Sequence, residues 1–98
     1  MKQISPNEVE SLRKQGKELS VIDVREAEEV AAGKIPGAVN IPLGLLEFRL
    51  QDLDKSKEHI VVCRSGGRSS MAANLLEERG YKVINMAGGM NDWQGPTE

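Results

Sequence analysis

The sequence is poor in the residues that build disulfides, metal sites and base-stacking surfaces. It contains one cysteine, Cys63, one histidine, His59, and only three aromatic residues. A single cysteine excludes an intramolecular disulfide and is typical of a reducing compartment. One cysteine with one histidine cannot supply the ligand set of a structural zinc site. Three aromatic side chains are too few for a platform on which nucleic-acid bases stack.

Long apolar runs and an excess of positive charge are also missing. No apolar segment approaches the roughly 20 residues that span a bilayer, and residues 1–6 lack the apolar core of a signal peptide. The chain has 13 basic and 15 acidic residues, a formal net charge of −2, so it offers no basic stripe for nucleic-acid phosphates. We therefore expect a cytoplasmic, metal-free protein that binds neither nucleic acid nor membrane.

What the sequence does contain is an alternation of short strand-like and helix-like segments. Its 98 residues, 39% hydrophobic and 29% charged, suffice for one modest core, so we expect a single domain over residues 1–98. The segments predicted as strands are 2–4, 19–24, 38–41, 60–62 and 81–85. Those predicted as helices are 6 to about 16, 26–32, 43–53, 71–79 and a short last one from 90. This order predicts an α/β fold: a small, mostly parallel sheet with helices on both faces.

Two local patterns refine this prediction. Ser5, Pro6 and Glu8 have the spacing of a capping box with proline at the first helical position, which marks the start of the first helix. The run 19–24 is nearly continuous in apolar residues and is interrupted at Asp23 near its carboxyl end. A continuous apolar run is typical of a central parallel strand, and functional residues of such sheets gather at the carboxyl ends of the strands.

The most informative stretch is residues 60–70, IVVCRSGGRSS, which predicts a strand, a short loop and the start of a helix. Cys63 stands at the end of the strand, and the loop after it contains two glycines and two arginines but no acidic residue. In such a unit the loop N–H groups and the helix N-terminus point toward one spot that favours negative charge. A thiol held there ionises below its ordinary pKa. Taken alone, a lone cysteine is more often a small buried hydrophobe, and the loop around Cys63 reverses that balance.

The residues of this loop are the predicted substrate site. Cys63 is the candidate nucleophile, and the backbone N–H groups of residues 64–68 are candidates to hold an anionic sulfur. We expect the two glycines to let the loop curl with its amides inward. A cation at a helix N-terminus is unfavourable, and an anionic ligand would account for Arg68 there. Arg64 either guides the substrate or faces water. The predicted substrate-binding residues are Arg64, Ser65, Gly66, Gly67 and Arg68.

Other polar residues have structural explanations. Asp23 and Arg25 more plausibly brace the site than take part in chemistry: Asp23 by accepting N–H groups at a strand end, Arg25 by pairing with Glu28 or Glu29. Ser69 is a third supporting residue. His59 begins a strand after a charged connector and is expected to be solvated. The remaining large side chains near the end of the chain are expected to pack the last helix: Met86, Met90 and Trp93.

Four motifs in this order resemble the single-domain rhodanese (thiosulfate sulfurtransferase) family. They are residues 23–26 (DVRE), 33–42 (GKIPGAVNIP), 63–69 (CRSGGRS) and 88–93 (GGMNDW). The third is similar to the family's six-residue active-site loop, and the fourth to its C-terminal Gly-Gly-x-x-x-Trp motif. The family usually has histidine where Lys34 stands, a departure to which we attach no catalytic consequence. Each string is short, but the four occur in the family's order, and the resemblance covers nearly the whole chain.

The resemblance implies a five-stranded, mostly parallel sheet and a catalytic cycle through Cys63. Cys63 would take sulfane sulfur from a small anionic donor, thiosulfate or a polysulfide, and become a persulfide. It would then pass that sulfur to a nucleophilic acceptor: cyanide, a small thiol or a thioredoxin-like protein. The chemistry needs no cofactor, because the thiolate is the nucleophile and the loop amides can stabilise the anionic persulfide.

Two other functions remain open at this point. The domain could be a sulfur carrier or docking module that acts only within a larger complex, because fold does not settle function. A cysteine-dependent phosphatase or arsenate reductase is less favoured. The related phosphatases have a Cys-x5-Arg loop, whereas Cys63 and Arg68 are separated by four residues, and the shorter ring suits a sulfur atom better than a phosphoryl group. Arg68 keeps that alternative alive, since guanidinium groups bind tetrahedral oxyanions well.

Overall fold

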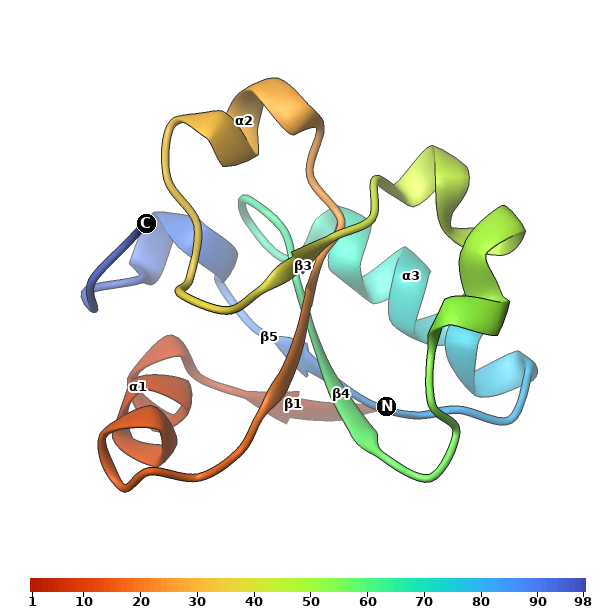
Figure 1. Ribbon diagram of the computed structural model, residues 1–98, viewed down its shortest axis with the longest axis horizontal. Helices are drawn as coiled ribbons and strands as arrows, with labels where there is room; N and C mark the ends of the chain where they lie inside the picture. The colour runs from red at the N-terminus through yellow and green to blue at the C-terminus, as the bar shows by residue number, and fades with distance from the viewer.

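All five strands run parallel in the computed structural model, which describes residues 1–98 (Figure 1). The sheet has the strand order β1-β5-β4-β2-β3, so β4 lies at its centre. The strands are β1 (Lys2–Ile4), β2 (Ser20–Asp23), β3 (Val39–Asn40), β4 (Glu58–Val62) and β5 (Lys82–Met86). Because every strand is parallel, all carboxyl ends meet at one edge of the sheet, and Cys63 follows the central strand at that edge. The predicted α/β fold with a small parallel sheet is confirmed.

Helices cover both faces of the sheet, as the sequence predicts. The helical segments are α1 (Pro6–Lys14), α2 (Ala27–Ala31), the 3₁₀ segment η1 (Leu43–Asp52), α3 (Gly67–Glu78) and the short 3₁₀ segment η2 (Gly89–Asp92). In Figure 1, η1 and α3 lie on one side of the sheet, α1 and η2 lie on the other, and α2 lies beyond the carboxyl ends of the strands. The edge that carries Cys63 is therefore flanked by helical segments on both sides.

The core consists of two apolar clusters, one on each face. Neighbouring strand residues alternate between them: Ile22 and Val61 contribute to the cluster under α3 and η1, whereas Val21 and Ile60 contribute to the cluster under α1. Leu76 of α3 belongs to the first cluster. This alternation explains the nearly continuous apolar runs in the sequence, since a strand covered on both faces needs apolar residues at every position.

The start of α1 agrees with its sequence pattern. The Ser5 hydroxyl accepts a hydrogen bond from the Glu8 N–H at 3.1 Å, and the Glu8 carboxylate accepts one from the Ser5 N–H at 3.4 Å. Pro6 occupies the first helical position, where its missing N–H costs nothing. Val9 is fully buried and attaches the helix to the sheet.

Two helices differ from the prediction. Helix α3 begins at Gly67 and not at Met71, because a first turn needs no strong helix former and the Gly66 carbonyl accepts the Ser70 N–H at 3.1 Å. The segment after Pro42 forms a 3₁₀ helix that is interrupted at Arg49, where φ is −123° and ψ is 18°. Its apolar residues therefore do not follow one straight α-helical stripe.

His59 is buried, so the expectation of a solvated histidine is wrong. The residue lies on the central strand β4 and is only 2% exposed. Nδ1 lies 2.6 Å from the Ser20 hydroxyl, and Nε2 lies 2.8 Å from the Asp54 carbonyl oxygen. Because the carbonyl can only accept, Nε2 donates and Nδ1 accepts from Ser20. Both ring nitrogens are satisfied, which is why this histidine at the second position of β4 can be buried.

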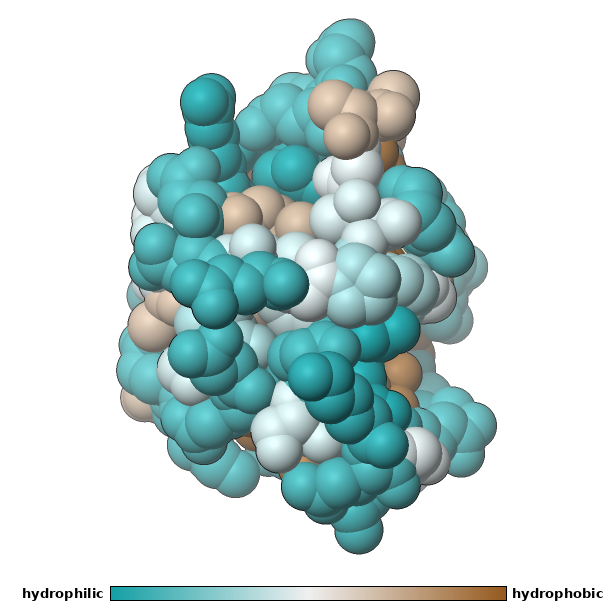
Figure 2. Space-filling view, turned by 90° about the vertical axis from the view of Figure 1, so that its left-hand side faces the viewer, coloured by the Kyte–Doolittle hydropathy of each residue, from teal (hydrophilic) through white to brown (hydrophobic).

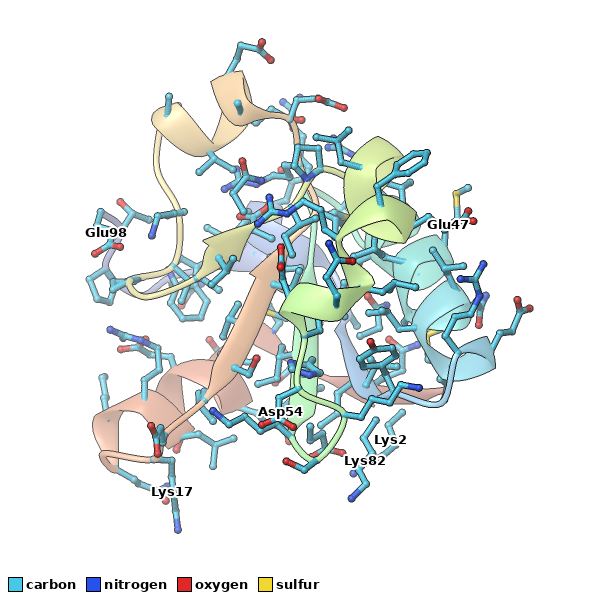
Figure 3. All side chains as sticks on the ribbon, turned by 45° about the vertical axis from the view of Figure 1, so that its right-hand side comes forward. Lys2, Lys17, Glu47, Asp54, Lys82 and Glu98 are labelled. Atoms are coloured by element: carbon cyan, nitrogen blue, oxygen red, sulfur yellow. The ribbon has the colours of Figure 1, made fainter.

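The outer surface is mainly polar. Figure 2 shows the side that carries α1, α2 and the end of the chain, and apolar atoms appear there only in small separate patches. In Figure 3, Lys2, Lys82 and Asp54 lie together at the edge where β4 and β5 begin, away from the edge that carries Cys63. None of the helices is long and apolar enough to cross a lipid bilayer.

Candidate active site

Cys63 lies at the first position after β4, with its side chain buried to 1% exposure. The loop turns back over the sulfur at Gly66, whose φ of +106° is a conformation that L side chains rarely adopt. This turn brings the Gly66 N–H to 3.0 Å from Sγ. Sγ also lies 3.3 Å from the Ser69 hydroxyl oxygen in the first turn of α3. The thiol is thus surrounded by hydrogen-bonding groups of its own loop.

These contacts decide how readily the thiol ionises. Burial of Cys63 raises its pKa, but hydrogen bonds from Ser69, Gly66 and Ser65 outweigh the burial and hold the pKa below its ordinary value. In the thiol form the sulfur donates to the Ser69 hydroxyl, which itself donates to the Gly66 carbonyl at 3.2 Å. When the sulfur loses its proton, the Ser69 hydroxyl proton is free to turn toward it. The loop is therefore arranged to favour a thiolate.

The two loop glycines have different roles. Gly66 needs its positive φ, and a Cβ there would lie 3.4 Å from the Gly88 nitrogen. Gly67 has no positive φ, and a Cβ at that position would meet nothing within 4 Å. Gly67 is the first residue of α3, so the curl that the sequence assigned to both glycines is produced at Gly66 alone.

Asp23 and Arg25 form a buried ion pair beside the loop. Nη2 of Arg25 lies 2.8 Å from Oδ2 of Asp23, and Nε lies within 3.1 Å of both carboxylate oxygens. The Arg25 side chain also donates to the Gly33 carbonyl at 2.8 Å, while the Asn40 side chain donates to the Asp23 and Arg25 carbonyls at 2.9 Å. The supporting role predicted for these residues thus has a geometric basis. The predicted partners of Arg25, the carboxylates of Glu28 and Glu29, are wrong: its carboxylate partner is Asp23.

Arg68 pairs with Glu29, which the sequence analysis did not connect to it. Nη1 and Nη2 of Arg68 lie 2.6 and 2.8 Å from the two carboxylate oxygens of Glu29, a bidentate pair that joins α3 to α2. The hydrogen bond from Arg68 is the main reason that the pKa of Glu29 falls to about 2, and the same pair raises the pKa of Arg68. The cation at the start of α3 thus has a carboxylate partner within the chain.

Segment η2 holds the active-site loop through two backbone hydrogen bonds. The Met90 N–H donates to the Cys63 carbonyl at 2.8 Å, and the Asn91 N–H donates to the Arg64 carbonyl at 2.9 Å. Gly89 permits this approach, since a Cβ there would lie 2.4 Å from the Cys63 oxygen. Gly89 of the 88–93 motif is therefore part of the structure that holds the active-site loop.

A cavity of about 380 Å³ opens beside the loop, between α2, η2 and the end of the chain. Its walls include Arg25, Glu29, Arg64 and Asn91. Arg64 is exposed, and it takes part in none of the ion pairs of the structure. A larger cavity of about 540 Å³ lies on the α1 face, where aliphatic side chains line most of it and Ser20 and Lys57 are among its polar residues. Cys63 lines neither cavity, but the 380 Å³ cavity is bordered by Arg64, the residue that follows Cys63 in the loop, and by Arg25 and Glu29 of the two ion pairs.

The predicted site residues lie together around this loop. Ser65, Gly66 and Ser69 contribute hydrogen bonds to the Cys63 sulfur, and the Asp23–Arg25 and Glu29–Arg68 pairs lie beside the loop. No three histidine, cysteine, aspartate or glutamate side chains converge where they could hold a metal ion. Sequence reasoning named Glu29 only as a possible partner of Arg25 and missed its pair with Arg68, and it missed the contact of Gly89 with the loop. The only signal for Glu29 was an acidic helix placed after a strand end, and for Gly89 the paired glycines.

Comparisons with known proteins agree with this geometry. Residues 5–96 match the family model described as rhodanese-like domain. The chain is 44% identical over 98 residues to YtwF of Bacillus subtilis, whose name assigns it provisionally to the sulfurtransferases, and the match covers 100% of this chain and 95% of that protein. It is 48% identical over 81 residues to YrkF of the same organism, named provisionally as a sulfur carrier protein. That match covers 82% of this chain but only 44% of YrkF.

A solved structure gives the same result for the fold. The crystal structure of a rhodanese-like domain protein from Staphylococcus aureus superimposes with a TM-score of 0.95 at 33% sequence identity. The superposition covers 100% of this chain and 97% of that one.

Proposed function

The chain belongs to the rhodanese-like domain family, and from that premise we propose that it transfers sulfane sulfur through a persulfide on Cys63. The observation that carries the proposal is the environment of Sγ: the Gly66 N–H at 3.0 Å, the Ser69 hydroxyl at 3.3 Å and a pKa held below its ordinary value. A thiolate is the reactive form of cysteine toward sulfur.

The first half of the reaction loads the cysteine. The Cys63 thiolate attacks the outer sulfur of thiosulfate, a persulfide or a polysulfide, and a new S–S bond forms as the donor's S–S bond breaks. The leaving group takes the bonding electrons and departs as sulfite, a thiolate or a shortened polysulfide. The Cys63 persulfide carries a negative charge on its terminal sulfur, and the amides of the 64–68 loop are the groups available to hold it.

The second half of the reaction transfers the sulfur from Cys63 to an acceptor. An acceptor nucleophile, a thiolate or cyanide, attacks the terminal sulfur, and the electrons of the broken S–S bond return to Sγ. The products are a persulfide of the acceptor, or thiocyanate, and the original Cys63 thiolate. A thioredoxin-like protein is a further acceptor of this class. The cycle needs a reduced Cys63, for which a cytoplasmic location is suitable.

Steady-state turnover tests this proposal. Wild-type protein with thiosulfate or cysteine persulfide as donor and cyanide as acceptor should show ping-pong kinetics, because the donor product leaves before the acceptor binds. Cys63→Ser should retain its circular dichroism spectrum and lose turnover. Substantial residual activity in that variant would exclude the Cys63 cycle.

A sulfur carrier is the second candidate, and the name of YrkF favours it. A carrier would load a persulfide on Cys63 but discharge it only to a specific protein. Loading by a small donor without turnover to cyanide or small thiols would therefore identify a carrier. Turnover with small acceptors would identify a free enzyme.

The phosphatase and arsenate reductase alternative has less to support it. The loop spacing is one residue short, and the Arg68 guanidinium that would grip a tetrahedral oxyanion is held by the Glu29 carboxylate. Hydrolysis of an aryl phosphate that depends on Cys63 would revive this alternative.

A further inference from the structure

The active site has three arginines, and two of them are neutralised by carboxylates of the same chain. Arg25 is paired with Asp23 at 2.8 Å, and Arg68 with Glu29 at 2.6 Å. Arg64 is the one arginine of the loop without an ion pair. The loop is rich in positive charge by sequence, but the folded site carries little net positive charge.

We propose that Glu29 is a specificity-determining residue: by holding Arg68, it makes the site select monoanionic persulfide donors over the dianion thiosulfate. This inference rests on the proposed sulfur transfer through Cys63 and names the donor class of that site. Glu29 acts through Arg68 and is thus a positioning residue, not a catalytic one.

The position of Glu29 is fixed by more than its pair with Arg68. Glu29 is the third residue of α2, and its Oε1 accepts the Glu26 N–H at 3.1 Å in a capping box. The pKa of about 2 keeps Glu29 ionised throughout the neutral range. The carboxylate and the guanidinium meet through two parallel hydrogen bonds, the strongest geometry available to these groups. The pair occupies one N–H of Nη1 and one of Nη2, so a donor meets an Arg68 whose charge is already compensated and whose Nη1/Nη2 edge is blocked unless Glu29 is displaced.

The negative charges near the Cys63 sulfur repel a dianionic donor more than a monoanionic one. Cys63 must be a thiolate to react, and its one free cationic neighbour on the loop is Arg64. A thiosulfate dianion approaching a thiolate needs more than one positive charge to offset the repulsion, and Arg68 is already neutralised. Glu26 lies close enough to influence the pKa of Arg68 and adds further negative charge to this side. A persulfide with one negative charge meets about half the repulsion, since Coulomb energy scales with charge.

The two loading reactions form the same S–S bond on Cys63 but differ in the charge and the leaving group of the donor. With thiosulfate, the Cys63 thiolate forms the new S–S bond and sulfite leaves as a dianion. With an alkyl persulfide anion, the same bond forms and an alkyl thiolate leaves as a monoanion. Neither reaction needs another reactant, and the intrinsic reactivity of each donor is the same for every variant, so the change in the ratio of the two rates between wild type and a variant reports the charge of the site.

The test is the second-order rate of persulfide loading on Cys63, measured in a single turnover with thiosulfate and with cysteine persulfide, whose net charge is −1 at neutral pH. The key variant is Glu29→Gln, because glutamine keeps the capping-box acceptor and removes the charge. Glu28→Gln is the matched control: it removes a carboxylate from the neighbouring exposed position, which makes no ion pair. A double variant, Glu29→Gln with Arg68→Gln, removes the released cation as well.

Wild type should load faster from cysteine persulfide than from thiosulfate. Glu29→Gln should raise the thiosulfate rate about five- to tenfold and the persulfide rate less than about twofold, which narrows the donor ratio. In steady state the gain should appear as a lower KM for thiosulfate with little change in kcat. The gain should shrink at high salt, which screens the released charge. Glu28→Gln should match wild type, and the double variant should lose the gain.

An unchanged donor ratio in Glu29→Gln would overturn the inference, as would an equal gain for both donors or a gain that persists without Arg68. These outcomes are distinct from failure of the proposed function. If sulfur transfer itself is wrong, neither donor will load sulfur on Cys63 in any variant, and the mass of the protein will not change.

Discussion

Two arginine–carboxylate pairs flank the same cysteine, and they differ in almost everything except their chemistry. Asp23 and Arg25 are two residues apart, and their side chains are 1% and 8% exposed. Glu29 and Arg68 are 39 residues apart, and their side chains are 27% and 34% exposed. The first pair joins the end of β2 to the loops around it, and the second bridges α2 and α3 at the mouth of the site.

This difference shows that burial decides whether an ion pair mainly stabilises the fold or mainly sets the charge of a surface site. A buried pair cannot lose one partner without leaving a charge in a low-dielectric interior, so Asp23 and Arg25 act as scaffold. A half-exposed pair gains little stability, because water and salt screen it. Glu29 and Arg68 are therefore free to set the charge that a substrate meets.

The largest effect is expected at the buried pair. Arg25→Ala leaves the buried Asp23 carboxylate without its cationic partner. The variant should lower the free energy of unfolding by about 3–5 kcal/mol, measured by urea denaturation. The matched control is Arg79→Ala, which breaks the exposed pair with Glu47 and should cost at most about 1 kcal/mol.

Arg25→Lys keeps the charge and should fall between wild type and Arg25→Ala, so the comparison holds even where the alanine variant is too unstable to measure. If Arg25→Ala costs no more than Arg79→Ala, the distinction between the two kinds of pair is wrong.

A smaller but still substantial loss of stability is expected from a substitution at Gly89, the residue through which η2 approaches the active-site loop. Alanine there would place its Cβ 2.4 Å from the Cys63 carbonyl oxygen and at a φ of +60°. Overpacking against backbone should cost about 1–3 kcal/mol and displace the loop that holds Sγ. Thermal denaturation and the rate of Cys63 alkylation measure the two effects.

Gly44→Ala is the control, because a Cβ at that position meets nothing within 4 Å. A Gly89→Ala protein as stable and as reactive as Gly44→Ala would remove η2 from the account of the site.

The smallest stability effect is expected at the exposed pair, and it should depend on pH. The pKa of Glu29 falls from 4.5 to about 2 on folding, so its contribution is fully present above pH 4.5 and is lost as the pH falls toward 2. Glu29→Gln should therefore be less stable than wild type by at most about 1 kcal/mol at pH 7. The difference should shrink below pH 4.5 and vanish near pH 2.

Urea denaturation of both proteins across this range gives the measurement. Other carboxylates titrate in both proteins and cancel in the difference. If the difference in the free energy of unfolding between wild type and Glu29→Gln widened as the pH fell, the depressed pKa of Glu29 would be contradicted.

Local patterns predicted the fold well. The capping box at Ser5 and Glu8 marked the first helix, and the apolar runs marked the strands, because these signals act within a few residues. The start of α3 was missed by four residues, since Gly67 has weak helix propensity and the first turn is stabilised by its position after Gly66. The 3₁₀ geometry of η1 was missed because apolar spacing does not reveal a break at Arg49.

The site was only partly predictable, for a physical reason. Cys63 and its glycines are neighbours in sequence, so their arrangement could be inferred from the loop itself. Glu29 and Arg68 meet only after the strands align, and no spacing in the sequence joins positions 39 residues apart. His59 was misjudged for the same reason, as its partner Ser20 lies on a different strand.

The most direct test of the central claim is the intact mass of the protein before and after incubation with thiosulfate or cysteine persulfide, and again after cyanide. The account predicts the gain of one sulfur atom, its removal by cyanide and no gain in Cys63→Ser. A protein whose Cys63 reacts with alkylating agents but never gains sulfur from either donor would contradict the account.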